Sequence, residues 1–194
     1  YGFDKYEVTE TTGIDREELI KAGADFREYF NSDEEVLDVQ VVQYGVLRSI
    51  YNAREIAHMA DVKGLVQGVF TVHTGTGIYM VMFLIAGALI YRKRWLKMAA
   101  LFAAVGGLLT LGVMTVLGLA SLVGFQRLFL AFHLISFSND LWQLDPHRDV
   151  LLMMFPQGFF LDVTLWIAGS TAVEACLLSS YLVARWIIRV RGAK

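Results

Sequence analysis

The sequence predicts an all-α fold, a polytopic bundle of membrane-spanning helices with short helices outside the bilayer. Of the 194 residues, 56% are hydrophobic and 19% are charged, and the mean hydropathy is +0.49. That composition is too apolar for an ordinary soluble domain of this size. Charged residues are absent from 64–91 and from 98–126, and the run 163–184 contains only Glu174. At about 1.5 Å per helical residue, each run can cross a hydrocarbon core of about 30 Å.

These runs divide the chain into a polar first part and a transmembrane second part. We predict an acidic helical segment over 1–63 and a bundle over 64–194, with spans at about 65–91, 98–124 and 163–185. Residues 1–64 carry 7 Lys and Arg against 14 Asp and Glu, a net charge of −7, whereas the rest carries +5. The basic residues flank apolar spans and form no patch of their own, so nucleic-acid binding is not expected. A single Cys excludes a disulfide scaffold.

The distribution of Lys and Arg predicts the orientation in the membrane. The linker 92–97 (RKRWLK) and the tail after residue 184 are basic, which places both in the cytoplasm by the positive-inside rule. The segment 1–63 and the loop 125–162 would then lie together on the outer side of the membrane. Three spans with a cytoplasmic C-terminus put Tyr1 outside, and the chain begins with Tyr rather than Met. We therefore expect a fourth, N-terminal span upstream of this sequence.

Short helices are expected on the outer side. Residues 3–35 are typical of two polar helices, the second running from Asp15 to Phe30 with acidic residues in its first turn. Residues 46–63 are also typical of a helix. In the loop 125–162 we expect interfacial helices, one of which starts at Asp145-Pro146 and ends near Phe155, before Pro156.

One face of the helix predicted over 46–63 is rich in polar chemistry. Tyr51, Arg54, Glu55, His58 and Asp61 share that face by their spacing, and Asp61 could orient the His58 imidazole. The alternative is a solvated face held by ion pairs.

A second polar cluster follows in the outer loop. His133 precedes four polar residues in the sequence, Ser136, Ser138, Asn139 and Asp140. The alternative is a hydrogen-bonded structural histidine.

Two further polar groups lie inside the predicted spans. His73 stands among threonines in the first span, and Glu174 is near the middle of the third. Ionisable residues within a membrane are functional candidates by default, because their burial is costly. A hydrogen-bonded structural role is the alternative for each.

The available side chains favour acid–base chemistry over metal or nucleophilic catalysis. Glu55-x-x-His58 has a di-iron ligand spacing but occurs once, and the HExxH motif is absent. A zinc site with His58, His133 and a carboxylate, or haem ligation by His73 and His133, stays open as an alternative. Cys176 lies within a span and is expected to be inert, and no G-x-S-x-G elbow exists. We therefore predict neither a metal nor another cofactor.

The two polar clusters resemble the signature regions of a known family. Residues 51–63 (YNAREIAHMADVK) and 132–142 (FHLISFSNDLW), with Asp145-Pro146 and Met154-Phe155-Pro156, are similar to the lipoprotein intramolecular transacylase (Lit-like) family of bacterial integral membrane proteins. The first motif, R-E-x-x-H-M-x-D-V-K, is specific. The resemblance implies a four-span protein and an acyl transfer from the sn-2 position of a diacylglyceryl-cysteine lipoprotein to the α-amino group of the same cysteine.

The resemblance also assigns roles to residues. The two functional histidines of the family fall on His58 and His133, which we expect to be catalytic. We expect substrate contacts from Tyr51, Arg54, Asn139 and Trp142, and support for them from Glu55, Asp61 and Asp140. The partner would be a diacylated lipoprotein or a phospholipid of the membrane. Two other functions remain possible from the sequence: a non-catalytic membrane subunit of a larger complex, and a haem- or metal-binding membrane protein.

Overall fold

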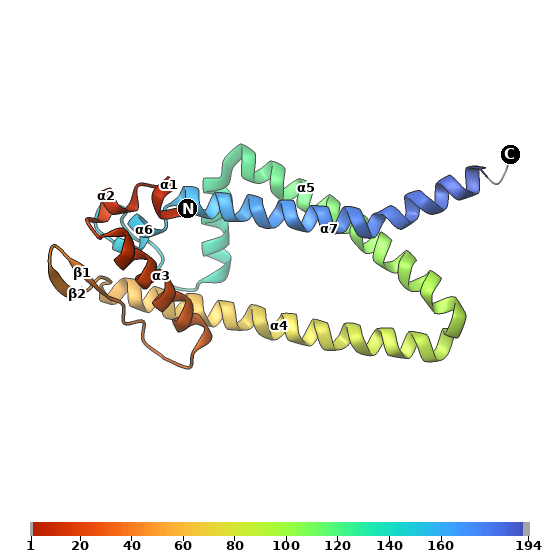
Figure 1. Cartoon of the computed structure of the whole chain (residues 1–194), viewed down its shortest axis with the longest axis horizontal. Helices are drawn as coiled ribbons and strands as arrows, with labels where there is room; N and C mark the ends of the chain where they lie inside the picture. The colour runs from red at the N-terminus through yellow and green to blue at the C-terminus, as the bar shows by residue number, and fades with distance from the viewer. Residues whose placement is uncertain (1, 192–194) are drawn as a thin grey trace. The chain divides into compact units, whose positions relative to one another are not determined.

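The computed structural model describes residues 2–191, and most of them are helical. The elements in chain order are α1 (Gly2–Lys5), α2 (Val8–Thr12), α3 (Arg16–Asn31), β1 (Gln40–Gln43), β2 (Val46–Ser49), α4 (Ala53–Tyr91), the 3-10 turn η1 (Arg92–Arg94), α5 (Trp95–Ser136), α6 (Val150–Met154) and α7 (Gln157–Arg191). Figure 1 shows α4, α5 and α7 as the long elements. The prediction of a helical membrane fold is confirmed, with a small hairpin added to it.

The described residues form two compact units. The first, which we call the polar unit, comprises residues 2–72 and 129–160. The second, which we call the apolar unit, comprises residues 73–128 and 161–191. The long helices run from one unit into the other, so the predicted boundary at residue 63 falls inside α4.

The polar unit has a buried hydrophobic core of its own. Its members come from the N-terminal segment, the start of α4 and α6: Val8, Ile14, Leu19, Ala22, Tyr29, Leu37, Val39, Val41, Ile50, Tyr51, Met59, Leu151 and Met154. Figure 1 shows α1–α3, β1, β2 and α6 gathered near the start of α4. Because Met59 is in this core, packing sets the rotation of α4 at the adjacent residue, His58.

A β-hairpin occupies part of the segment for which a helix was predicted. Strands β1 and β2 pair antiparallel, with Gln43 opposite Val46 next to the turn. The turn residues Tyr44 and Gly45 have φ of 52° and 79°, the left-handed pair that two-residue hairpins require. The prediction of a helix over 46–63 is therefore wrong in its first part, and α4 begins only at Ala53.

The start of α4 is defined by a capping box. The side-chain oxygen of Asn52 accepts hydrogen bonds from the backbone N–H groups of Arg54 (2.9 Å) and Glu55 (3.1 Å). In return, Glu55 Oε2 accepts one from the backbone N–H of Asn52 (2.8 Å). This reciprocal arrangement satisfies N–H groups that a helix end otherwise leaves unpaired.

Helices α5 and α7 pack closely in the apolar unit through small residues. A Cβ atom on Gly107 would lie 2.7 Å from the carbonyl oxygen of Ala175 and 2.6 Å from Ser179 Oγ. Ser179 also donates to the carbonyl oxygen of Ala175. Such close approach of small residues is the usual packing mode of membrane helices.

Two helical stretches of the described residues are long and apolar enough to cross a membrane. They are Ala53–Ser136, which comprises α4, η1 and α5, and Gln157–Leu182 in α7. The number of crossings and their orientation stay predictions, and so do the span limits at 65–91, 98–124 and 163–185.

The segment predicted as a loop with short helices over 125–162 agrees with expectation at its start and differs at Asp145. The backbone of α5 is non-helical at Gly124 (φ −170°, ψ 64°), so α5 consists of two helices joined at a kink, and residues 125–136 form the second of them. Asp145 does not cap a helix: its side chain accepts from the backbone of His147 in a turn, and Asp149 precedes α6. The predicted end near Phe155 is confirmed.

Candidate functional site

Two histidines from distant parts of the sequence meet in the polar unit. The ring centroids of His58, on α4, and His133, near the end of α5, are 6.2 Å apart, with the planes inclined by 33°. His58 is 7% exposed and His133 9% exposed. The two histidines that the resemblance singles out are therefore buried, adjacent imidazoles in the folded chain.

A hydrogen bond to the backbone sets the tautomer of His133. Its Nδ1 lies 2.7 Å from the carbonyl oxygen of Phe129, one turn earlier in α5. Because a carbonyl oxygen only accepts, we assign the ring proton to Nδ1, which leaves Nε2 with an unprotonated lone pair. Nε2 can then accept a proton from a neighbouring group.

Aromatic side chains surround the His133 ring. The centroid distances are 4.5 Å to Phe129, 5.3 Å to Phe132, 5.7 Å to Phe137 and 5.1 Å to Trp142. Such packing limits water at the ring and restricts its rotation.

His58 has a buried nitrogen without a hydrogen-bond partner. That atom is Nδ1, in a ring that packs edge-on against Phe137 at 5.2 Å. His58 lies outside the predicted span, because it precedes the charge-free run 64–91. Burial, and next the neighbouring His133, lower the pKa of His58 from 6.5 to about 4, although Asp61 opposes the shift. His58 is therefore neutral near pH 7, with a polar atom available to a bound molecule.

Glu55 does not contact the histidines but ties α4 to α6. Its carboxylate is 1% exposed, and Oε1 accepts from the backbone N–H of Leu151 (2.7 Å). Burial raises the pKa of Glu55, although the hydrogen bonds from Leu151 and Asn52 oppose this shift.

Asp149 makes a second buried link to the start of α4. Asn52 Nδ2 donates to Asp149 Oδ1 (2.9 Å), and the backbone N–H of Asp145 donates to Oδ2 (2.7 Å). Burial alone would raise the pKa of Asp149, but these hydrogen bonds and Arg148 hold it below its usual value. Neither Asn52 nor Asp149 was singled out from the sequence, although N-x-x-E before an apolar run is a capping signal that could have identified Asn52.

The other predicted polar residues join α4 to the segment 137–143. Arg54 Nη2 donates to the backbone oxygen of Asp140, and Asn139 Nδ2 donates to Asp61 Oδ2 (2.8 Å). Asp61 thus has Asn139 as its hydrogen-bond partner, which differs from the expected hydrogen bond to the His58 imidazole.

Tyr51 and Lys63 support the core next to the site. The hydroxyl of Tyr51 donates to the sulfur of Met154 (3.1 Å), and burial raises the pKa of Tyr51 above its usual value. Lys63 Nζ donates to the backbone oxygen of Glu34 (2.6 Å) and lies 4.2 Å from the centre of the Tyr29 ring. Tyr51 therefore links the residues before α4 to α6, and Lys63 links α4 to the N-terminal segment.

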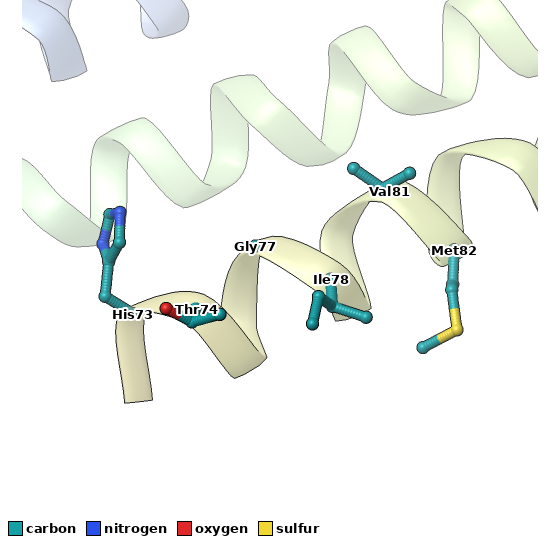
Figure 2. A pocket seen from close by; sticks show the side chains of 6 residues that line it. All are labelled: His73, Thr74, Gly77, Ile78, Val81 and Met82. Atoms are coloured by element: carbon teal, nitrogen blue, oxygen red, sulfur yellow. The ribbon is translucent and has the colours of Figure 1, made fainter. Parts of the chain in front are cut away.

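The polar groups predicted inside the spans lie in the apolar unit. His73 lines a groove of about 370 Å³ on α4, together with Thr74, Gly77, Ile78, Val81 and Met82. In Figure 2, the His73 ring points toward the ribbon of α5, whereas Met82 points away from it. Glu174 is exposed on α7. Among the described residues, no three His, Cys, Asp or Glu side chains are grouped so that they could hold a metal ion.

Comparison with known proteins identifies relatives of the sequence and of the fold. A sequence model of the family described as "Lipoprotein intramolecular transacylase Lit" matches residues 1–160. Comparison with curated proteins finds no match.

Solved structures of the membrane-integral lipoprotein intramolecular transacylase Lit from Bacillus cereus are similar to this chain. One has a TM-score of 0.75 at 19% identity and covers 99% of this chain and 82% of its own. A second, with a histidine replaced by arginine, has a TM-score of 0.68 at 18% identity, covering 98% and 79%. A third, with a histidine replaced by alanine, has a TM-score of 0.65 at 18% identity, covering 99% and 80%.

At this level of identity the structures establish a shared fold, and the family model carries the assignment. It spans residues 1–160 of a 194-residue chain, including both motifs that hold the histidine pair. The chain therefore belongs to the lipoprotein intramolecular transacylase family and is a membrane enzyme that catalyses intramolecular acyl transfer.

Proposed function

We propose that this enzyme moves the sn-2 acyl chain of a diacylglyceryl-cysteine lipoprotein to the α-amino group of the same cysteine. His58 and His133 act as its acid–base pair. The proposal rests on the geometry of the histidine pair. The ring centroids of the two buried imidazoles are 6.2 Å apart, and the hydrogen bond from His133 Nδ1 to a backbone carbonyl leaves Nε2 of His133 as an acceptor. Family membership supplies the class of reaction.

His133 serves as the general base in this proposal. The cysteine α-amine attacks the carbonyl carbon of the sn-2 ester, and its proton passes to Nε2 of His133. As the new C–N bond forms, the bond from the carbonyl carbon to the glyceryl oxygen breaks. That oxygen receives a proton from the imidazolium, directly or through His58, and becomes a free hydroxyl. The product is an N-acylated cysteine that keeps one acyl chain on its glyceryl group.

The chemistry needs no nucleophile from the enzyme. The substrate amine has an unperturbed pKa near 7.7–8.0, so a neutral imidazole is basic enough to assist its attack. The main contribution of the protein is to hold amine and ester together in a site from which the aromatic side chains exclude water.

Two of the residues expected to contact the substrate suit that role. Trp142 is half-buried against His133 and can pack on the acyl or glyceryl part. Arg54 is exposed and keeps N–H groups for an ester oxygen. We assign no substrate contact to Asn139, because its amide nitrogen donates to Asp61 and its amide oxygen accepts from the backbone N–H of Leu141. We assign no substrate contact to Tyr51, because its hydroxyl is buried against Met154.

The partner in this proposal is a diacylated lipoprotein in the outer leaflet of a bacterial plasma membrane. The basic linker 92–97 supports a cytoplasmic position for that end of α4, which puts the polar unit on the opposite side.

The test is expression in bacterial cells whose lipoproteins carry only the diacylglyceryl group. Substrate and product are isomers with equal mass, so tandem mass spectrometry must locate the acyl chain. Mild alkali provides a second readout, since it removes ester-linked chains and leaves an amide-linked one in place. We expect N-acyl cysteine with the unaltered enzyme and at least a 100-fold lower yield with His58→Ala or His133→Ala.

The matched control is His147→Ala, because His147 is an exposed histidine of the same unit. It should keep full activity. If the enzyme gives no N-acyl product in these cells, or if both His58→Ala and His133→Ala keep full activity, the proposal is wrong.

A further inference from the structure

Two hydrogen bonds connect one face of α4 to the segment that follows α5. Arg54 Nη2 donates to the backbone oxygen of Asp140, and Asn139 Nδ2 donates to Asp61 Oδ2 at 2.8 Å. We call this pair of bonds the clasp. His58 lies between its two ends on the same helical face, because the three α4 residues follow one another at intervals of four and three.

The segment held by the clasp also contacts both histidines. Phe137 packs against the His58 ring at 5.2 Å, and Trp142 packs against the His133 ring at 5.1 Å. The clasp residues Asn139 and Asp140 stand between these two aromatic residues in the chain. A shift of this segment would therefore move packing partners of both imidazoles.

Internal hydrogen bonds make the segment a defined turn. Asn139 Oδ1 accepts from the backbone N–H of Leu141 (3.0 Å), and Asp140 Oδ1 accepts from Gln143 Nε2 (3.0 Å). The backbone N–H of Gln143 donates to the oxygen of Asp140 (3.1 Å). Both polar ends of the Asn139 amide are thus used within the protein.

Stability alone does not account for the clasp. Arg54, Asn139 and Asp140 are exposed, and exposed polar contacts of this kind usually contribute little to the free energy of unfolding. Catalytic geometry is far more sensitive, since a displacement of about 1 Å can cost about 100-fold in rate. The clasp can affect that geometry, because it holds the segment whose Phe137 and Trp142 pack against the two imidazoles.

We infer that Asp61 and Asn139 are positioning residues, which hold the segment 137–143 so that His58 and His133 keep their reactive geometry. They act through the histidine pair and do not touch the substrate. The inference rests on the proposed function and adds to it the contact that maintains the site.

An exchange of the two side chains tests the inference. Asn139→Asp places two carboxylates at the contact, which removes the donor and adds repulsion. The double variant Asp61→Asn with Asn139→Asp restores one amide donor and one carboxylate acceptor in reversed order. Turnover of a purified diacylated lipopeptide, together with the thermal midpoint in detergent, would be measured for each variant.

We expect Asn139→Asp to lower kcat by 10- to 100-fold with little change in KM, and the double variant to recover kcat to within about threefold. Asn31→Asp adds the same charge at an exposed asparagine of the polar unit and should leave kcat unchanged. The thermal midpoints of all variants should agree within a few degrees. A lower kcat would then result from altered positioning of the histidines and not from a folding defect.

Two results would overturn the inference. Full activity of Asn139→Asp would show that the contact has no role in the reaction. Lasting inactivity of the folded double variant would show that Asn139 contacts the substrate directly. An unaltered enzyme that yields no N-acyl product would instead overturn the proposed function.

Discussion

The polar unit buries many of its hydrophobic side chains, whereas the apolar unit leaves many of its own exposed. In the polar unit Val8, Leu19 and Val39 are completely buried. In the apolar unit Leu89 is 75% exposed and Leu109 69% exposed. The first arrangement is that of a domain stabilised by removing apolar surface from water. The second suits a bundle whose outer surface meets lipid, where close packing of small residues takes over from the hydrophobic effect.

This difference bears on where the two histidines of the candidate site are found. Buried hydrogen bonds and a packed core fix side-chain geometry in the polar unit, and both His58 and His133 belong to it. Helix α4 connects this core to the apolar unit, so one element holds His58 and a candidate membrane span.

The largest change in stability is expected from Glu55→Ala in the polar unit. The substitution leaves the N–H groups of Leu151 and Asn52 without their acceptor. The cost is about 1–3 kcal/mol for the buried N–H of Leu151 and less for that of Asn52, which is an exposed residue. Thermal unfolding in detergent measures the loss, and hydrogen exchange should locate it in residues 2–72 and 129–160. Glu28→Gln, at an exposed carboxylate, serves as the control. Equal midpoints for the two variants would contradict the role given to the Glu55 contacts.

A smaller effect is expected from Gly107→Leu in the apolar unit. The added side chain meets Ala175 and Ser179 at distances that force α5 and α7 apart, which typically costs about 1–3 kcal/mol. Gly112→Leu is the matched control, because a Cβ there meets no atom within 4 Å. Hydrogen exchange should rise around residues 104–107 and 175–179 and stay unchanged in the core of the polar unit. A midpoint of Gly107→Leu no lower than that of Gly112→Leu would refute the close packing.

A third effect is a pH dependence that originates at His58. Its pKa is lowered from 6.5 to about 4 in the folded protein, so the unfolded chain binds a proton first as the pH falls. The stability contributed by neutral His58 is therefore complete above about pH 6.5 and is lost as the pH falls toward 4. The thermal midpoint of His58→Gln should therefore vary less with pH between those values than the midpoint of the unaltered protein does. Since Glu55 and Asp149 are present in both proteins, their titration cancels in the difference. Parallel pH curves would refute the burial of neutral His58.

The sequence predicted the long helices well and the short elements poorly. Long apolar runs are a strong signal, because a helix is one of the few structures that satisfies its backbone in lipid. The sequence signal for the hairpin β1–β2 is weak, because each strand has four residues and Tyr44-Gly45 is not a typical turn pair. For the same reason the start of α4 was placed too early.

The candidate site was predicted in its residues but only partly in its contacts. His58 and His133 were identified from their motifs, and the structure brings them together. Glu55 and Asp61 were assigned to the support of the site, yet their partners, Leu151 and Asn139, could not be foreseen. Spacing along one helix shows which side chains share a face, and it does not show what that face meets.

The sequence by itself determined the helical membrane class, the polar character of the first part of the chain and the two motifs that show the family. These properties depend on composition and on residues that are close together in the sequence, so they can be recognised without the fold. The tertiary structure decided the distance between the two imidazoles, the tautomer of His133 and the partners of Glu55 and Asp61. Glu55 and Leu151 are 96 residues apart, and Asp61 and Asn139 are 78 apart. Contacts at such separations exist only after the chain has folded, because packing of the whole core selects which polar groups meet.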